Sequence, residues 1–310
     1  MAYVSNTGTT IYDVVEAMDN LLVSVGWIQH RRTTKNYNNQ PRTDHVIWEG
    51  SGDGTDKIYI QVKVMNHQRM YLDSMVGYDE ALQRWEQPGS IQQQLLSAEE
   101  STVAQPMFTV TNEENFAYWI FADTWHVIGV ARMGLIYESF YMGFLNPISS
   151  ERQYPYPMYI AGNGSATSSS WPNNNAGSFI FPHNNSGWLR RADGVWRSFN
   201  AQQPSAFVDY TNPDPDTVGT VFPYSSHNGY LIPNYSSSSA IAQDNFLLIP
   251  VMLNSNNPVD ICGIMRNVFW VSGTRDIGTE QILVFGADQY IVFDNKQSRF
   301  ANSYFCIKMS

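Results

Sequence analysis

The chain has 310 residues, a formal net charge of −10 and a charged fraction of 15 %, against about 25 % in an average soluble domain. Asn, Ser, Thr, Gln and Tyr stand in place of the missing charges, and such a surface is cheaper to desolvate, which favours extensive contact with other subunits or with glycans. The negative charge argues against direct nucleic-acid binding, because only the pairs Arg31-Arg32 and Arg190-Arg191 oppose it.

The first predicted element is an amphipathic helix over residues 10–25. Its apolar residues recur at three- and four-residue spacing, which gives the helix one apolar face. Thr9 or Thr10 can cap the start, and Gly26 stands where a helix commonly ends.

Strands separated by polar runs follow this helix. Residues 33–43 are predicted as a polar loop, and residues 78–86 as a short helix that stops before Pro88. The predicted strands of this part cover residues 27–32, 45–50, 57–66 and 107–111.

Residues 115–160 contain three aromatic-rich, β-type segments in succession and end on the run Tyr-Pro-Tyr-Pro. Turn residues at 122–124 and at Gly134 fall where an antiparallel meander needs its reversals. No catalytic signature lies in this segment. We therefore expect it to be part of the framework of the fold.

The composition changes at Ala161, from which Gly, Asn, Ser and Pro dominate as far as Ser239. Aromatic residues spaced through this region argue for an ordered, loop-rich excursion, because disordered segments are poor in aromatics. Apolar strands then resume at residues 245–253, 261–271, 280–285, 289–294 and 303–309.

These elements predict a mainly β fold of α+β type: an antiparallel sheet or sandwich with one packed N-terminal helix and a long loop-rich insertion. The predicted division is 1–160 for the α+β domain with its meander, 161–240 for the loop-rich region, and 241–310 for C-terminal strands that pack back on the main domain.

The two cysteines, Cys262 and Cys306, stand in apolar surroundings. Neighbouring strands could pair them, but buried free thiols in a reducing cytosol are the favoured interpretation. The first residues lack a signal-peptide pattern, and no apolar run approaches the roughly 20 residues that span a bilayer. We expect a protein made in the cytoplasm, without a membrane partner.

No pattern predicts a catalytic residue, a cofactor or a metal. The run 51–56 and the run 212–216 each place two Asp carboxylates close together, but turns and rigid loops explain both better than calcium binding. The six histidines show no metal-ligand spacing, and His126 is interpreted as a half-buried strand or turn residue. Glu138 is the acid best placed for glycoside hydrolysis, yet a strand-borne acid more often faces solvent or another subunit.

Three tryptophans of the Asn/Ser-rich region, Trp171, Trp188 and Trp196, are the candidate binding residues. On loops they could stack on sugar faces, or they could anchor subunit interfaces, where Trp and Tyr are enriched. We favour the interface. The aromatic residues of the meander are more simply explained as core residues and cross-strand pairs.

An ordered series of motifs spans nearly the whole chain outside that region. It resembles an under-characterised family of tailed-bacteriophage virion structural proteins. The motifs are Gly26-Trp27, Arg31-Arg32, Glu49-Gly50, Ile58-Tyr59-Ile60-Gln61-Val62, Tyr118-Trp119-Ile120-Phe121-Ala122, Tyr141-Met142-Gly143-Phe144-Leu145-Asn146-Pro147, Tyr154-Pro155-Tyr156-Pro157, Phe269-Trp270-Val271-Ser272-Gly273, Glu280-Gln281-Ile282 and Tyr290-Ile291-Val292-Phe293.

The resemblance implies a non-enzymatic homo-oligomer, in a ring of many copies at the neck, collar or tail of the particle, with other virion proteins as partners. Such a component is assembled in the cytoplasm of the bacterial host. The alternatives are a glycan-binding adhesin or receptor-binding module of the tail or baseplate, and a polysaccharide-degrading enzyme that uses Glu138.

Overall fold

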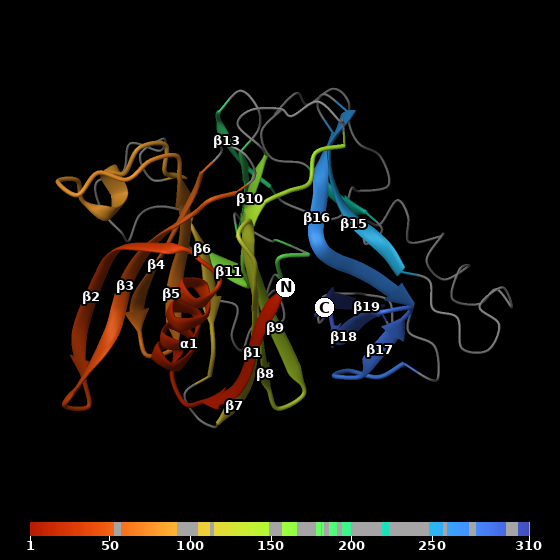
Figure 1. Ribbon diagram of the computed structural model, residues 1–310, viewed down its shortest axis with the longest axis horizontal. Helices are drawn as coiled ribbons and strands as arrows, with labels where there is room; N and C mark the ends of the chain where they lie inside the picture. Colours follow the sequence, from red (N-terminus) through yellow and green to blue (C-terminus); the bar gives the residue numbers. More distant parts are fainter. Residues whose placement is uncertain are drawn as a thin grey trace, which may run out of the picture.

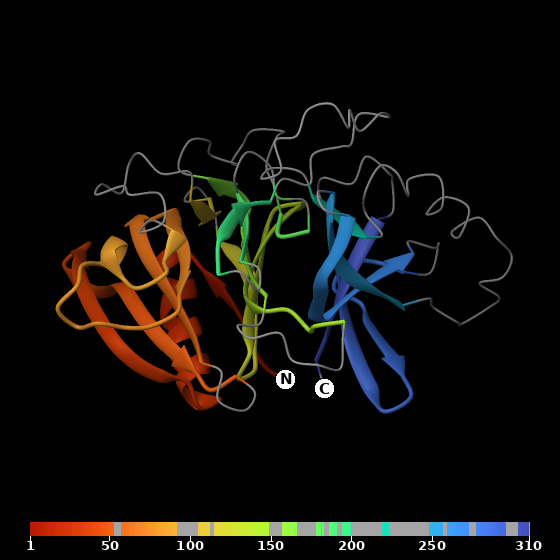
Figure 2. The same cartoon turned by 90° about the horizontal axis from the view of Figure 1, so that it is seen from above.

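In a computed structural model the chain forms three antiparallel sheets that lie side by side as layers, with helix α1 between two of them (Figures 1 and 2). The structure describes residues 1–52, 57–91, 105–111, 115–148, 157–165, 178–180, 182, 186–190, 194–199, 219–222, 248–256, 259–272, 277–295 and 303–309. The predicted mainly β fold with one N-terminal helix is confirmed.

The first layer, called here the helix-side sheet, has six strands in the order β11-β6-β5-β4-β3-β2. All of its pairings are antiparallel. Its strands are β2 (Ile28–Tyr37), β3 (Gln40–Gly50), β4 (Ile58–Asn66), β5 (Arg69–Met75), β6 (Pro106–Thr109) and β11 (Gly164–Ser165).

The middle sheet has seven strands in the order β1-β7-β8-β9-β10-β12-β13. The predicted meander forms its centre, and the reversal at Gly134 has the positive φ of 63° that a tight hairpin needs. Its strands are β1 (Ala2–Gly8), β7 (Phe116–Ala122), β8 (His126–Met133), β9 (Ile136–Phe144), β10 (Met158–Ala161), β12 (Gly187–Arg190) and β13 (Trp196–Ser198). The sheet thus crosses the predicted boundary at residue 160.

The C-terminal sheet has six strands in the order β14-β15-β16-β19-β18-β17. Its strands are β14 (Gly219–Phe222), β15 (Leu248–Asn256), β16 (Val259–Ser272), β17 (Ile282–Phe285), β18 (Asp288–Asp294) and β19 (Ser303–Lys308). The last five agree with the apolar segments that the sequence predicts.

Helix α1 (Ile11–Ser24) also forms where the periodicity predicts it. The carboxylate of Asp13 accepts hydrogen bonds from the backbone N–H groups of Thr9 (2.7 Å) and Thr10 (2.9 Å), which fixes the first turn. Gly26 follows the end with a φ of 95°, the left-handed conformation that glycine adopts without strain.

Two local predictions were wrong. Residues 33–43 are not a loop but the distal half of the β2–β3 ribbon, where Asn38 and Asn39 have the positive φ values (50° and 61°) of a two-residue hairpin turn. A polar ribbon has no apolar alternation, so the Asn-Asn pair was the available signal. Residues 78–86 contain no α-helix; only Arg84–Glu86 form a turn of 3₁₀ helix.

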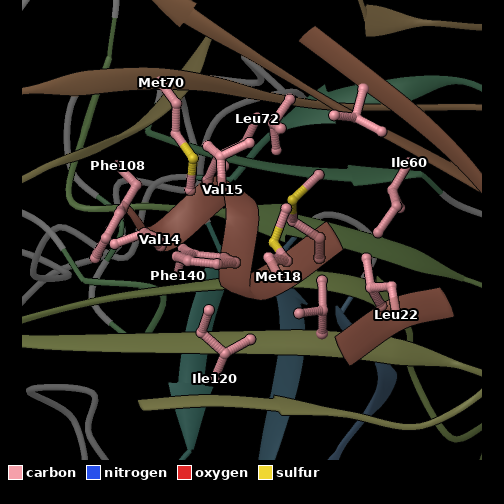
Figure 3. Packing of buried hydrophobic residues seen from close by; sticks show 14 of the residues in the cluster. Val14, Val15, Met18, Leu22, Ile60, Met70, Leu72, Phe108, Ile120 and Phe140 are labelled. Atoms are coloured by element: carbon pink, nitrogen blue, oxygen red, sulfur yellow. The ribbon is translucent and has the colours of Figure 1, made fainter. Parts of the chain in front are cut away.

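The first core lies between the helix-side sheet and the middle sheet, and α1 fills its centre (Figure 3). Val14, Val15, Met18 and Leu22 of the helix are fully or almost fully buried there. They meet Ile60, Met70 and Leu72 from one sheet and Ile120 and Phe140 from the other. Burial of these side chains from both sides accounts for the position of the helix.

The second core lies between the opposite face of the middle sheet and the C-terminal sheet. Phe121, Ile128 and Tyr141 of the middle sheet belong to this core, and Trp270 and Phe293 belong to it from the C-terminal sheet. Ring pairs such as Phe121–Phe293, with centroids 6.2 Å apart, join the two layers. The middle sheet is therefore buried on both faces.

Candidate assembly surface

The three predicted tryptophans are not gathered in one site. Trp188 and Trp196 lie on strands β12 and β13, not on loops, and both are buried in the first core with exposed fractions of 6 % and 2 %. The indole N–H of Trp196 donates to the carbonyl of Gly89 (2.8 Å). Neither indole is open to a sugar in the single chain. Trp171 lies outside the described residues.

The other singled-out residues also have structural positions. Arg32 pairs with Asp19 at 3.1 Å, and Arg31 donates to the carbonyls of Glu80 (2.8 Å) and Leu82 (3.0 Å). Arg31 and Arg32 therefore bind helix α1 and the segment around residues 80–82 of their own chain. Arg190 is buried, and Arg191 lies outside the described residues.

Glu138 is 1 % exposed, so its carboxylate does not lie open to solvent as the glycosidase alternative requires. The cysteines are free thiols, as expected, and burial raises the pKa of Cys306 far above its usual value. The possible cation site at 212–216 lies outside the described residues, as do Asp53 and Asp56 of the run 51–56.

Within the described ranges, no group of three or more His, Cys, Asp or Glu side chains could hold a metal ion. In the same part of the chain, no helix is long and apolar enough to cross a membrane.

A buried polar network lies within the helix-side sheet, and no sequence pattern predicts it. His45 Nε2 donates to Gln61 Oε1 (3.1 Å), and Gln61 Nε2 donates to Asp73 (3.0 Å) and to the carbonyl of Arg84 (3.1 Å). Burial lowers the pKa of His45 to about 4 and raises the pKa of Asp73 to about 6. The network attaches the turn around Arg84 to the sheet.

A second polar cluster joins all three layers at the turn between β7 and β8. The main-chain carbonyl of Asp123 accepts from the indole N–H of Trp27 (2.6 Å), next to the helix-side sheet. Its carboxylate meets the Nδ1 atom of His126 (2.9 Å) and accepts from Asn267 Nδ2 (3.3 Å), which lies on β16 of the C-terminal sheet. We call Trp27, Asp123, His126 and Asn267 the three-layer junction.

The electrostatics of the three-layer junction favour a charged carboxylate. Burial alone would raise the pKa of Asp123, but the charge and hydrogen bond of His126 and the N–H of Trp125 outweigh burial and lower this pKa to about 2. The ring of His126 is fully buried and stacks on Tyr141, with centroids 5.4 Å apart. A residue so enclosed does not reach a substrate, so the junction is structural.

The feature that points outward is strand β17. Its residues Ile282, Val284 and Phe285 are 50 %, 62 % and 54 % exposed, three large apolar side chains within four positions. The strand ends in a two-residue turn in which Gly286 has a φ of 64°, and Figures 1 and 2 show the β17–β18 hairpin at the outer margin of the C-terminal sheet.

Strand β17 also offers unpaired backbone groups, because it is the last of the described strands of its sheet. Phe285 and Asp288 close the two-residue turn and form a hydrogen-bonded pair. Hydrogen-bonded and non-hydrogen-bonded pairs alternate along an antiparallel ladder, so the backbone N–H and C=O groups of Ile282 and Val284 point away from β18. The hydrogen bond from Val292 N to the carbonyl of Gln281 (3.0 Å) fits this alternation.

The hairpin is electrically neutral on an acidic molecule. Residues 281–287 contain no charged side chain. The charges at the two ends are both paired: Glu280 with Arg132 (2.5 Å) and Asp288 with Lys308 (2.8 Å). Two copies of a chain with a net charge of −10 can therefore approach here without direct like-charge opposition.

The long edge strand β2 contrasts with β17. Over its ten residues it presents Arg31, Arg32 and Lys35, and its pairing with β3 has two register shifts. Charges and bulges on an edge strand prevent pairing with another chain. Strand β17 has neither in its pairing with β18, and we take it as the candidate assembly surface.

The sequence predicts a strand at residues 280–285 but does not predict that its apolar side chains are exposed. The available signal was the uncharged run Gln-Ile-Leu-Val-Phe-Gly, whose composition is typical of strands that pair with other chains. Its exposure became visible only with the strand order of the sheet.

Comparison with models of known protein families gives no match, and a search of curated proteins finds no significantly similar sequence.

Proposed function

We propose that the chain is a non-enzymatic structural component of a tailed-bacteriophage virion, and that it forms an oligomeric ring or decoration at the neck, collar or tail. The observation that supports assembly is the exposed, uncharged edge strand β17. An apolar edge with free backbone groups is a template for another strand, and native proteins protect such edges unless they use them.

The resemblance to virion structural proteins supports the virion as the setting, and three of its motifs lie in strands of the described residues. Tyr118–Ala122 lie within β7, Phe269–Ser272 within β16, and Tyr290–Phe293 within β18. These three motifs therefore belong to the framework of the layers.

The proposal is tested by the native mass of the purified chain, with Val284→Lys as the main variant. A lysine on the free edge places an unpaired charge in the contact, so we expect an oligomer for the wild type and a smaller species for the variant. Leu135→Lys is the matched control, because Leu135 is 94 % exposed on the hairpin turn between β8 and β9.

Three results would count against the proposal: a wild-type chain that stays monomeric at high concentration, a Leu135→Lys variant as monomeric as Val284→Lys, or purified virions without peptides of this chain. Mass spectrometry of virions measures the copy number. Labelled antibodies in electron micrographs locate the chain on the particle.

A further inference from the structure

A groove of about 520 Å³ lies between β1 and α1, at the opposite edge of the middle sheet from β13. Its apolar lining includes Val4 from the strand and Ala17 and Leu21 from the helix. Asn6 and Asn20 line it as uncharged polar residues. The groove therefore joins a strand edge to an apolar floor.

Among the described residues β1 pairs only with β7, which leaves free backbone groups along its outer edge. The N–H of Thr7 is bound by the side chain of Asn6 (2.8 Å) and so points away from β7. By the alternation of an antiparallel ladder, Ser5 and Tyr3 also direct their N–H and C=O groups to the open edge.

Two acids line the groove, and one guanidinium offsets part of their charge. Asp13 and Glu16 both pair with Arg42, at 2.6 Å and 2.7 Å. Asp13 also accepts two backbone N–H groups at the start of α1. The three side chains keep a net charge of −1, so an uncharged strand suits this groove better than an acidic one would.

We infer that the β17 edge of one copy pairs with the β1 edge of a second copy, beside its helix α1. This inference rests on the proposed function and names the partner surface of the assembly. Each edge offers two residues with free backbone groups, Ile282 and Val284 on one side and Tyr3 and Ser5 on the other. Together they supply the groups for about four backbone hydrogen bonds.

The side chains match in the same arrangement. On paired strands, residues of opposed positions lie on the same face, so Ile282 and Val284 come beside Tyr3, which is itself 47 % exposed. Phe285 lies on the other face of β17, the face that pairs with the side of Val4 and the apolar floor of the groove. Exposed apolar side chains of both edges are thus covered together.

The contact joins two different surfaces, so it is heterologous and repeats from copy to copy. A repeated heterologous contact generates a ring when its rotation closes. A β17 strand that paired with itself would instead give a two-fold dimer.

Cysteine cross-linking tests the inference on the full chain, with Cys262→Ser to remove the more accessible native thiol. One protein carries Ser5→Cys, and the others carry Ile282→Cys or Val284→Cys. The Cα atoms of opposed hydrogen-bonded residues in an antiparallel pair lie about 5.5 Å apart, within the Cα–Cα range that a disulfide spans. We expect a disulfide in the mixture of Ser5→Cys with one of the β17 variants.

A disulfide in the Val284→Cys protein alone would overturn the inference, because β17 would then pair with itself. Oligomers that form without any Ser5 cross-link would overturn it too, while the proposed function stands. A chain that stays monomeric under all conditions would overturn both this inference and the proposed function. Asn20→Trp, which fills the groove, should weaken assembly at least tenfold, whereas Val23→Trp, on an exposed site of the same helix outside the groove, should not.

Discussion

Replacing Asp123 by Asn should destabilise the chain, because the carboxylate is the centre of the three-layer junction. The asparagine keeps one oxygen for the N–H groups of Trp125 and His126, which Asp123 accepts at 2.8 Å and 3.1 Å. It loses the charge beside His126 and turns an amide donor toward Asn267.

The size of the effect follows from the pKa. The folded value is about 2. An unfolded Asp has a pKa of about 3.9, and at about 1.4 kcal/mol per pKa unit the difference is worth about 3 kcal/mol at pH 7. Because the folded pKa is the lower one, this stabilisation is present in full above about pH 4 to 5 and is lost as the pH falls toward 2.

Urea unfolding followed by tryptophan fluorescence measures this loss at pH 7, 5, 4 and 3. The deficit of Asp123→Asn against the wild type should be near its full size at pH 7 and pH 5 and should shrink at pH 3. Asp288→Asn is the control, because it breaks an exposed ion pair and should change the stability far less. A deficit that stays constant from pH 5 to pH 3 would refute the reasoning, as would no deficit at pH 7.

Three further outcomes are expected from the same unfolding assay. Gly129→Ala should cost about 1–3 kcal/mol, because its Cβ would lie 2.0 Å from a buried ring, whereas Gly278→Ala, with open space around it, should be nearly neutral. Trp196→Ala should cost about 3–5 kcal/mol of stability. On a glycan array the wild type and a folded Trp196→Ala variant should not differ in sugar binding. For His45→Gln we expect the free energy of unfolding to fall as the pH rises from 4 to 6. The raised pKa of Asp73 lowers stability over this range, and the lowered pKa of His45, which raises stability over the same range in the wild type, is absent from the variant. Equal stability of Gly129→Ala and Gly278→Ala, loss of sugar binding in a folded Trp196→Ala, or a rising stability in His45→Gln would each contradict its prediction.

The sequence was sufficient for elements whose pattern is local. Helix α1 follows from apolar spacing and its end residues, and the meander follows from apolar segments between turn residues. The distal half of the β2–β3 ribbon was missed because both of its faces are largely polar beyond residue 33, so the alternation that marks a strand is absent.

Features that depend on distant pairing could not be predicted. Asp123 and Asn267 are 144 positions apart, and their hydrogen bond exists only because two sheets pack on each other. Trp188 and Trp196 lie among Gly and Asn residues, which suggested loops, yet they enter a core formed by strands from the first half of the chain. The exposure of β17 follows from strand order, which no local pattern encodes.

Burial of the middle sheet on both faces has a consequence for how its strands select their partners. In a sheet with one apolar and one polar face, a register shift of one residue moves the apolar side chains to the polar face. In the middle sheet the same shift would exchange one set of apolar side chains for another. Correct alignment then comes from the tight turns between β7, β8 and β9 and from the shapes of opposed residues. Gly129 leaves room for the ring of the opposed Phe140, and Gly143 allows the backbone of Trp125 and His126 to approach closely. These two glycines therefore help to set the strand register, and substitutions there should produce misaligned strands before they produce an unfolded chain.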